Sequence, residues 1–302
     1  MDEFIGEIAA LSTALCWAFT SVFFTLGGRR VGSVVVNRVR LLMALVFLSM
    51  TNFILYGNFI PIHAEPERWM WLGLSGIIGF IIGDGMLFQA FVVIGPRLSM
   101  LLMSLVPVIS TLVAYFWFGE TLTVYELAAM GITLAGISWV VSERNKNANQ
   151  PEDLTFKQLL GGIALGIGGA AGQALGLLAS KKGLGGGFPP LSANLIRVFV
   201  AGVLMWIYAF SSGRARYTIS RLADKKATLF ILGGSIFGPF VGVWLSLVAI
   251  DHARIGIAST LMALTPILII PLAYWIFRDK LTLGAVFGTI VAVSGAVLLI
   301  LM

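Results

Sequence analysis

One carboxylate lies well inside an apolar stretch of this sequence, where it could do chemistry. Asp84 stands between Gly83 and Gly85 in the apolar run 69–93. A charged carboxylate is costly in the core of a bilayer unless it is neutralised, paired or hydrated, so such a residue faces a cavity or a partner. Because burial disfavours the charged form, Asp84 is a candidate for proton coupling and for binding a cationic substrate group.

The structural interpretation of Asp84 is an ion pair with an arginine, or a position nearer to the membrane interface. Arg40 and Arg197 are the candidate partners, and they occupy matched positions in Asn37-x-x-Arg40 and Asn194-x-x-Arg197. They could attract anionic substrate groups or lock a gate by pairing. Their alternatives are snorkelling to lipid headgroups and a structural role in tying their helices to the bundle. We favour the structural role, because Asn accompanies Arg in both places.

Several large polar or aromatic side chains inside apolar runs are candidates for lining a substrate site. Gln and Trp combine a hydrogen-bonding group with a surface on which an amphipathic metabolite can pack. The same side chains can instead form hydrogen bonds between helices. Together with Asp84, the substrate-binding candidates are Trp17, Gln89, Gln173 and Trp244.

Two prolines lie at matched depths in two apolar runs, Pro107 in 96–118 and Pro266 in 255–277. Proline lacks a backbone N–H and removes one hydrogen bond from a helix interior, which predicts a bend. The bend could serve as a hinge or could only fix the shape of the helix. Pro107 and Pro266 are therefore hinge candidates.

The composition indicates that these residues belong to a membrane protein. Of 302 residues, 58% are hydrophobic and only 11% are charged, whereas about 25% are charged in soluble domains. The net charge of +6 comes from Lys and Arg scattered between apolar runs, which does not fit nucleic-acid binding. A spanning helix needs about 20 mostly apolar residues. Ten such runs are present, at 5–26, 34–56, 69–93, 96–118, 123–142, 157–180, 190–211, 227–250, 255–277 and 282–302.

The chain is a duplication of one five-helix unit. Residues 95–141 recur as residues 254–300 at a shift of 159 positions, with the proline and a late glycine (Gly136 and Gly295) in register. Because five is an odd number, the second unit must enter the membrane upside down relative to the first, giving an inverted repeat. We divide the chain into a first repeat (1–142), a linker (143–156) and a second repeat (157–302). Asp84 has no acidic counterpart at the matching position.

Small residues spaced four apart form three rows on predicted helices. Helices in lipid pack where small side chains let their backbones approach, so these rows predict helix–helix contact faces. The first two rows match at the shift of 159 and the third stands alone: Ser75, Gly79 and Gly83; Gly234, Gly238 and Gly242; Gly168, Gly172 and Gly176.

The sequence offers no cofactor or metal motif. Its two histidines, His63 and His252, fall in predicted loops, and Cys16 is the only cysteine, so no intrachain disulfide can form. No nucleotide-binding glycine motif occurs between a strand and a helix. We expect neither a cofactor nor a bound metal.

A turn and a late glycine complete a recognisable pattern. The turn is Gly119-Glu120-Thr121-Leu122-Thr123, and Thr123-x-x-Glu126 within and after it predicts a capping box that opens the next helix. With ten helices in two halves, arginines near the starts of helices 2 and 7, and prolines within helices 4 and 9, the chain resembles the EamA branch of the drug/metabolite transporter superfamily. The second half departs from the pattern, because Arg278-Asp279-Lys280 replaces the Gly-Glu-Thr turn.

The resemblance covers essentially the whole chain and implies a secondary transporter, usually an exporter of amino acids, nucleosides, sugars or toxic compounds. We therefore predict an all-α, multi-pass protein of a bacterial or archaeal cell membrane. We expect it to move small metabolites such as amino acids or drugs by alternating access, with protons as candidate coupling ions. Its expected partners are the substrate and the lipid bilayer, and not nucleic acid.

Two other classes and the orientation stay open at this stage. A membrane-embedded lipid or isoprenoid enzyme is the alternative, against which stands the lack of clustered acid–base residues. A channel is disfavoured because no charged pore ring is evident. Most loop Lys and Arg follow the odd-numbered helices, which favours termini outside the cell, whereas the resemblance implies cytoplasmic termini.

Overall fold

The computed structural model describes residues 4–94, 99, 102–143, 155–277 and 282–301, and over these residues it contains helices and no strand. The first repeat contains α1 (Ile5–Val31), α2 (Ser33–Tyr56), α3 (Pro66–Gly76), η2 (Ile77–Gly83), α4 (Asp84–Val93), α6 (Leu105–Phe118) and α7 (Val124–Glu143). The second contains α8 (Phe156–Leu184), α9 (Pro190–Ser211), α10 (Ala215–Arg221), α11 (Lys225–Ser235), η3 (Ile236–Gly242), α12 (Val243–His252), α13 (Ile255–Met262), α14 (Thr265–Phe277) and α15 (Leu283–Leu301).

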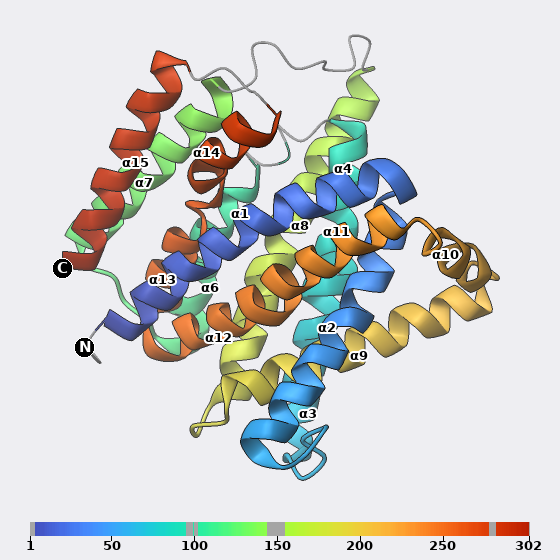
Figure 1. The fold of residues 1–302 in the computed structure, drawn as a ribbon. Coiled ribbons are helices and arrows are strands. Elements are labelled where there is room, and N and C mark those ends of the chain that lie inside the picture. Colours follow the sequence, from blue (N-terminus) through green and yellow to red (C-terminus); the bar gives the residue numbers. More distant parts are fainter. Residues whose placement is uncertain (1–3, 95–98, 100–101, 144–154, 278–281, 302) are drawn as a thin grey trace.

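The described helices pack into one bundle (Figure 1). Nine of the described segments are long and apolar enough to cross a membrane, and α6 is a shorter apolar helix. The predicted all-helical membrane class is confirmed. The predicted run 96–118 and the linker 143–156 lie partly outside the described residues. The polar connection between helices 7 and 8 contains the short helix α10, which hydropathy alone did not indicate.

The third and eighth spans each contain a π-helical segment at the same place in the repeat. η2 covers residues 77–83 and η3 covers residues 236–242, which coincide at the shift of 159. A π-helical turn holds extra backbone compared with an α-helical turn, and such turns are frequent at functional sites. In η3, Pro239 contributes no N–H to the helical ladder. η2 ends directly before Asp84, so the broken geometry lies next to the buried carboxylate.

The two predicted hinge prolines lie just after interruptions in the fourth and ninth spans. Residues 102–103 are helical and are separated from α6 by a turn at Ser104, and α13 and α14 are separated by a turn at residues 263–264. Pro107 and Pro266 therefore fall in the first turn of a resumed helix. The first four N–H groups of a helix have no intrahelical acceptor, so proline removes no hydrogen bond there. The structure shows matched breaks in place of a simple bend within a continuous helix.

The fifth and tenth helices, α7 and α15, lie side by side (Figure 1). Their contact depends on the two repeat-related glycines. A Cβ on Gly136 would lie 2.4 Å from the backbone nitrogen of Ala292, and one on Gly295 would lie 2.5 Å from Thr133 Oγ1. These helices belong to different repeats, so the duplicated glycine joins the two halves.

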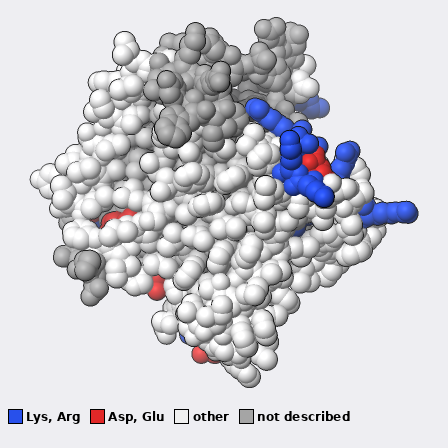
Figure 2. Space-filling view, in the orientation of Figure 1, with Lys and Arg blue, Asp and Glu red and all other residues white. Residues whose placement is uncertain are grey.

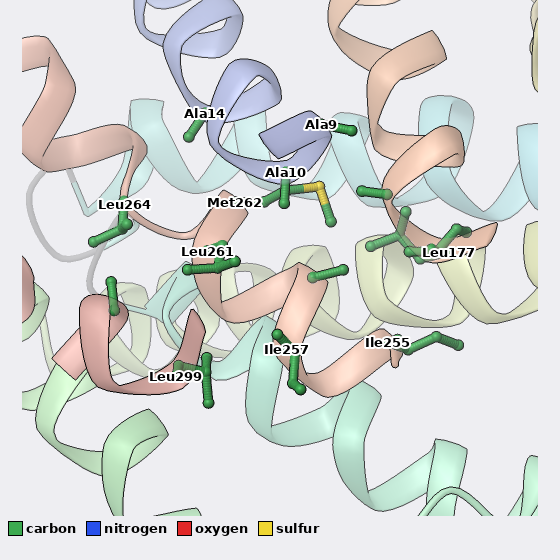
Figure 3. Close-up of a cluster of buried hydrophobic side chains, with 14 of the residues drawn as sticks. Ala9, Ala10, Ala14, Leu177, Ile255, Ile257, Leu261, Met262, Leu264 and Leu299 are labelled. Atoms are coloured by element: carbon green, nitrogen blue, oxygen red, sulfur yellow. The ribbon is translucent and has the colours of Figure 1, made fainter. Parts of the chain in front are cut away.

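The largest apolar cluster also combines both repeats. Figure 3 shows Ala10 of α1 beside Met262 of α13, and Ala9, Ala14 and Leu261 belong to the same cluster. Leu177 of α8 and Leu299 of α15 belong to the same cluster. The small side chains of α1 let α13 approach closely, which is the packing expected between helices in lipid.

The face of the bundle shown in Figure 2 is largely uncharged apart from a basic region. In Figure 2 the Lys and Arg side chains gather around an acidic spot over α10 and the neighbouring ends of α1 and α11. There Arg30 Nε lies 2.9 Å from Asp224 Oδ2. The backbone N–H of Ala227 and then the Arg30 side chain hold the pKa of Asp224 below its usual value. Asp224 thereby caps the start of α11.

Candidate functional site: a buried carboxylate between the repeats

Asp84 is buried at the start of α4 and binds side chains from both repeats. Its side chain forms an ion pair with Arg40 of α2, through Oδ2 and Nη2. Gln173 of α8 donates from Nε2 to Asp84 Oδ1 at 2.5 Å. Asp84 and Arg40 are only 6% and 7% exposed. Two donors therefore stabilise the ionised carboxylate in surroundings where an unpaired charge would be costly.

Arg40 is held from several sides. Its Nε donates to Asn37 Oδ1 at 2.8 Å, one helical turn earlier on α2. The guanidinium carbon lies 5.7 Å from the centre of the Phe24 ring and 5.5 Å from that of Phe88. Cation–π contacts of this kind strengthen when water is excluded. The guanidinium is consequently fixed in the orientation in which it meets Asp84.

The third span and α8 approach through the predicted rows of small residues. A Cβ on Gly172 would lie 2.6 Å from the Cα of Gly83, and one on Gly176 would lie 3.2 Å from the Cα of Gly79. The two backbones are therefore in direct contact. Gln173, next to Gly172, is brought within hydrogen-bonding distance of Asp84 by this approach.

The matching place in the second repeat has a different chemistry. Val243, the counterpart of Asp84, is buried in an apolar cluster with Leu41 and Leu195. Trp17 lies over Gly242, where an added Cβ would be 3.0 Å from the indole Nε1. Trp244 stacks on Phe240 with ring centres 6.4 Å apart. The polar cluster around Asp84 thus has an apolar and aromatic counterpart.

Arg197 is buried near the same cluster but is not its ion-pair partner. Its guanidinium carbon lies 4.9 Å from the centre of the Phe80 ring in η2. Within the described residues, its Nε and Nη1 have no hydrogen-bond partner. Asp84 acts on it electrostatically from beyond ion-pair distance. Of the two arginines that the sequence offered as partners, the structure pairs Asp84 with Arg40.

The structure does not bring all candidates together. Asp84, Arg40 and Gln173 form one cluster. Trp17 and Trp244 lie instead near Val243, the counterpart of Asp84 in the second repeat. Gln89 is exposed on α4. It stands five residues after Asp84, which places it about 140° away around an α-helix, so the two side chains leave the helix in different directions.

Two further links join the repeats through partners that the sequence does not identify. Glu120 accepts hydrogen bonds from Lys181 Nζ and, at 2.9 Å, from the backbone N–H of Ile255. Arg254 pairs with both carboxylate oxygens of Glu126. The partners are far apart in sequence, and only the inverted packing of the repeats makes them neighbours. Sequence spacing could predict Asn37 beside Arg40, because residues three apart share one helix face.

Glu126 also completes the predicted capping box at the start of α7. Its Oε2 accepts from the backbone N–H of Thr123 at 2.7 Å, and Thr123 Oγ1 accepts from the Glu126 N–H at 3.2 Å. The predicted capping box is confirmed. One side chain that is 3% exposed therefore caps a helix and ties it to the other repeat.

Replacing this glutamate should lower stability measurably. We expect Glu126→Ala to cost about 2 kcal/mol, because it removes a helix cap and the partner of Arg254 together. Thermal unfolding of the protein in detergent would measure the loss. Glu65→Ala is the matched control, since Glu65 pairs with Arg68 but its side chain is 67% exposed. That change should cost less than about 0.5 kcal/mol, and equal losses in the two variants would contradict the assignment.

Comparison with known proteins places this geometry in a family. The chain matches the EamA-like transporter family twice, over residues 4–142 and 160–301. It belongs to that family. The EamA matches confirm the resemblance drawn from the repeated motifs, and with the nine spanning segments they make the chain an integral, multi-pass membrane protein of a transporter superfamily.

One solved structure shares the EamA fold over nearly its whole length. It is described only as "Crystal structure of protein", and it aligns with a TM-score of 0.77, covering 99% of this chain and 98% of its own. The two sequences are 14% identical, so the likeness shows the fold alone. No curated protein matches the chain.

Proposed function

We propose that this EamA protein is a secondary active exporter of small metabolites, such as amino acids or drugs, that works by alternating access and is coupled to protons through Asp84. The observation that carries the proposal is the position of the Asp84 carboxylate, which binds Arg40 of the first repeat and Gln173 of the second. Because this carboxylate joins the two repeats, a change in its charge alters the interactions between them.

Proton uptake by Asp84 would change that contact directly. A neutral carboxyl group loses its ionic attraction to Arg40, and it is a weaker acceptor for the Gln173 amide. The charged groups around Asp84 are Arg40 and the more distant Arg197. Protonation would therefore leave two buried positive charges without a carboxylate, which favours a rearrangement that hydrates them or brings in another anion.

The inverted repeat supplies elements that could perform the rearrangement. The π-helical segments η2 and η3 and the breaks before Pro107 and Pro266 occur at matched positions in both halves. Matched interruptions allow either half to adopt the conformation of the other, which is the symmetry basis of alternating access. We propose the two prolines as hinges on this ground.

The neighbours of Asp84 also favour a carrier over an enzyme. Acid–base catalysis needs a second group that exchanges protons near neutral pH. The side chains that bind Asp84 are a guanidinium, which has no acceptor atom, and an amide, which is not an acid–base group. The cluster is suited to holding and releasing one charge, which is the requirement for coupling.

Transport by purified protein in liposomes tests the proposal. We expect wild-type protein to show saturable counterflow for at least one member of a panel of amino acids and cationic dyes, and accumulation driven by an imposed pH gradient. Asp84→Asn should keep counterflow and lose the gradient-driven accumulation, because the side chain no longer takes up a proton. Asp251→Asn is the control, since this carboxylate is exposed near the end of α12, and it should behave like the wild type.

Three results would contradict parts of this proposal. Gradient-driven accumulation that survives Asp84→Asn would remove Asp84 from coupling. Flux that rises linearly with concentration and shows no counterflow would indicate a channel. Chemical conversion of a lipid or isoprenoid by the purified protein would indicate the enzyme class.

A further inference from the structure

The buried arginine of α9 carries hydrogen-bond donors that no described residue satisfies. Arg197 is 3% exposed, and neither its Nε nor its Nη1 has an acceptor in the described part of the chain. The large majority of buried side-chain polar atoms in proteins are hydrogen-bonded. An arginine stays charged at physiological pH, so the missing acceptors are especially costly here.

The surroundings of Arg197 hold it in place without neutralising it. Its guanidinium packs on the Phe80 ring, and its Nη2 lies beside Gly79, where an added Cβ would be only 3.5 Å away. Its backbone carbonyl faces Gly76, since a Cβ there would lie 2.3 Å from the oxygen. One turn earlier, Asn194 donates to the carbonyl of Pro239 at 2.8 Å. The Arg197 side chain is therefore positioned by η2, and α9 contacts η3 through Asn194.

The charges in this region do not balance. Asp84 is committed to its ion pair with Arg40, and no described carboxylate lies within ion-pair distance of Arg197. Three buried charges thus sum to one positive charge. A single negative charge beside Arg197 would neutralise the region, whereas a dianion would reverse the imbalance.

Arg40, the counterpart of Arg197 in the first repeat, has the acceptors that Arg197 lacks among the described residues. It occupies the matched place in the first repeat, as the eighth residue of α2, just as Arg197 is the eighth residue of α9. Arg40 has a carboxylate, an amide oxygen and two aromatic rings as neighbours. The same residue at the same depth therefore has its acceptors in one half and lacks them in the other.

We propose that Arg197 is a binding subsite for a monoanionic carboxylate group of the transported substrate. Guanidinium groups bind carboxylates through pairs of parallel N–H donors. Both pairs on Arg197 include an unsatisfied donor, Nε on one edge and Nη1 on the other. On the side of Gly79, no side chain of residue 79 covers Nη2 of Arg197. The subsite rests on the proposed transport function and adds the chemical group that it recognises.

The subsite predicts an unusual effect of mutation on stability. A residue kept for binding, and not for packing, can be replaced without loss. We expect Arg197→Met to leave the Tm of the protein in detergent unchanged or to raise it. A fall in Tm as large as that of Asp84→Asn would mean that the guanidinium has a structural partner, and it would overturn the proposal.

Ligand binding is the direct test and needs no transport. We would titrate the purified protein with butyrate, benzoate and leucine, each against its neutral amide, and follow thermal unfolding by tryptophan fluorescence. At least one carboxylate should raise the Tm while its amide does not, and Arg197→Gln should weaken the apparent affinity about tenfold or more, the loss expected for one charge-assisted hydrogen bond. Arg38→Gln is the matched control, because Arg38 is equally buried but already donates to Thr218 at 2.9 Å.

These measurements test the Arg197 subsite separately from the proposed transport function. Equal effects of acid and amide, an affinity unchanged by Arg197→Gln, or no response to any of the three carboxylates would overturn the subsite. If carboxylates bind through Arg197 but wild-type protein shows no counterflow, the transport proposal fails and the subsite stands. If counterflow of a carboxylate is the same in Arg197→Gln and wild type, the carrier stands and the subsite fails.

Discussion

Asp84→Asn should destabilise the protein by about 3–5 kcal/mol, the loss typical when one partner of a buried ion pair is removed. The physical reason is the charge left behind, because Arg40 is almost fully buried and has no other carboxylate as a partner within the described residues. Asparagine keeps a carbonyl that can accept from Gln173, so the loss is electrostatic and not a loss of packing. Thermal unfolding in detergent would measure it.

A double variant separates this explanation from general damage. Combining Asp84→Asn with Arg40→Met removes both charges, and replacing a buried pair by neutral groups is often close to neutral for stability. The double variant should therefore recover most of the loss while gradient-driven transport stays absent. Recovery should be incomplete, because Arg197 also loses the attraction of Asp84. A double variant no more stable than Asp84→Asn would show that the pair is not the stabilising interaction.

Gly172→Ala should have the second large effect, from sterics alone. The new Cβ would lie 2.6 Å from the Cα of Gly83 and 3.1 Å from its nitrogen, and backbone atoms cannot turn aside as a side chain can. The two helices must separate, at about 1–3 kcal/mol or more. Because Gln173 moves with α8, its hydrogen bond to Asp84 should lengthen as well. Coupled transport should then fall together with the Tm.

The same substitution elsewhere on α8 provides the control. A Cβ on Gly161 would meet nothing within 4 Å. Gly161→Ala should therefore leave the Tm unchanged or raise it slightly, since alanine favours helix over glycine by about 0.5–1 kcal/mol. If both variants lost the same stability, the close approach of α8 to the third span could not be the cause.

The fold could be predicted from the sequence because its main determinants are visible in the order of the residues and need no knowledge of contacts between distant residues. Apolar runs of membrane-spanning length, a fixed shift between repeats and an odd number of helices per repeat lead directly to an inverted bundle. The rows containing Gly83 and Gly172 could be assigned to contact faces, since small residues mark close packing in lipid. The structure brings these two rows together.

The candidate site could be predicted only in part, and symmetry is the reason. Arg40 and Arg197 occupy equivalent positions in the sequence, which gives no ground for choosing between them as the partner of Asp84. Both guanidinium groups lie against the third span, Arg40 on Phe88 and Arg197 on Phe80, and this packing determines which of them reaches Asp84. The π-helical segments were also missed, because one widened turn leaves the hydropathy of a fully apolar span unchanged.

The π-helical segment before Asp84 sets the rotational phase of everything that follows it in the third span. The widened π-helical turn takes up one residue more than an α-helical turn, so closing η2 as a regular α-helix with all its residues kept would rotate α4 by about 100° against α3. Asp84 would then leave the azimuth at which it meets Arg40, although no residue of the cluster had been changed. For this span, the π-helical backbone of residues 77–83 determines the direction in which the carboxylate of residue 84 points.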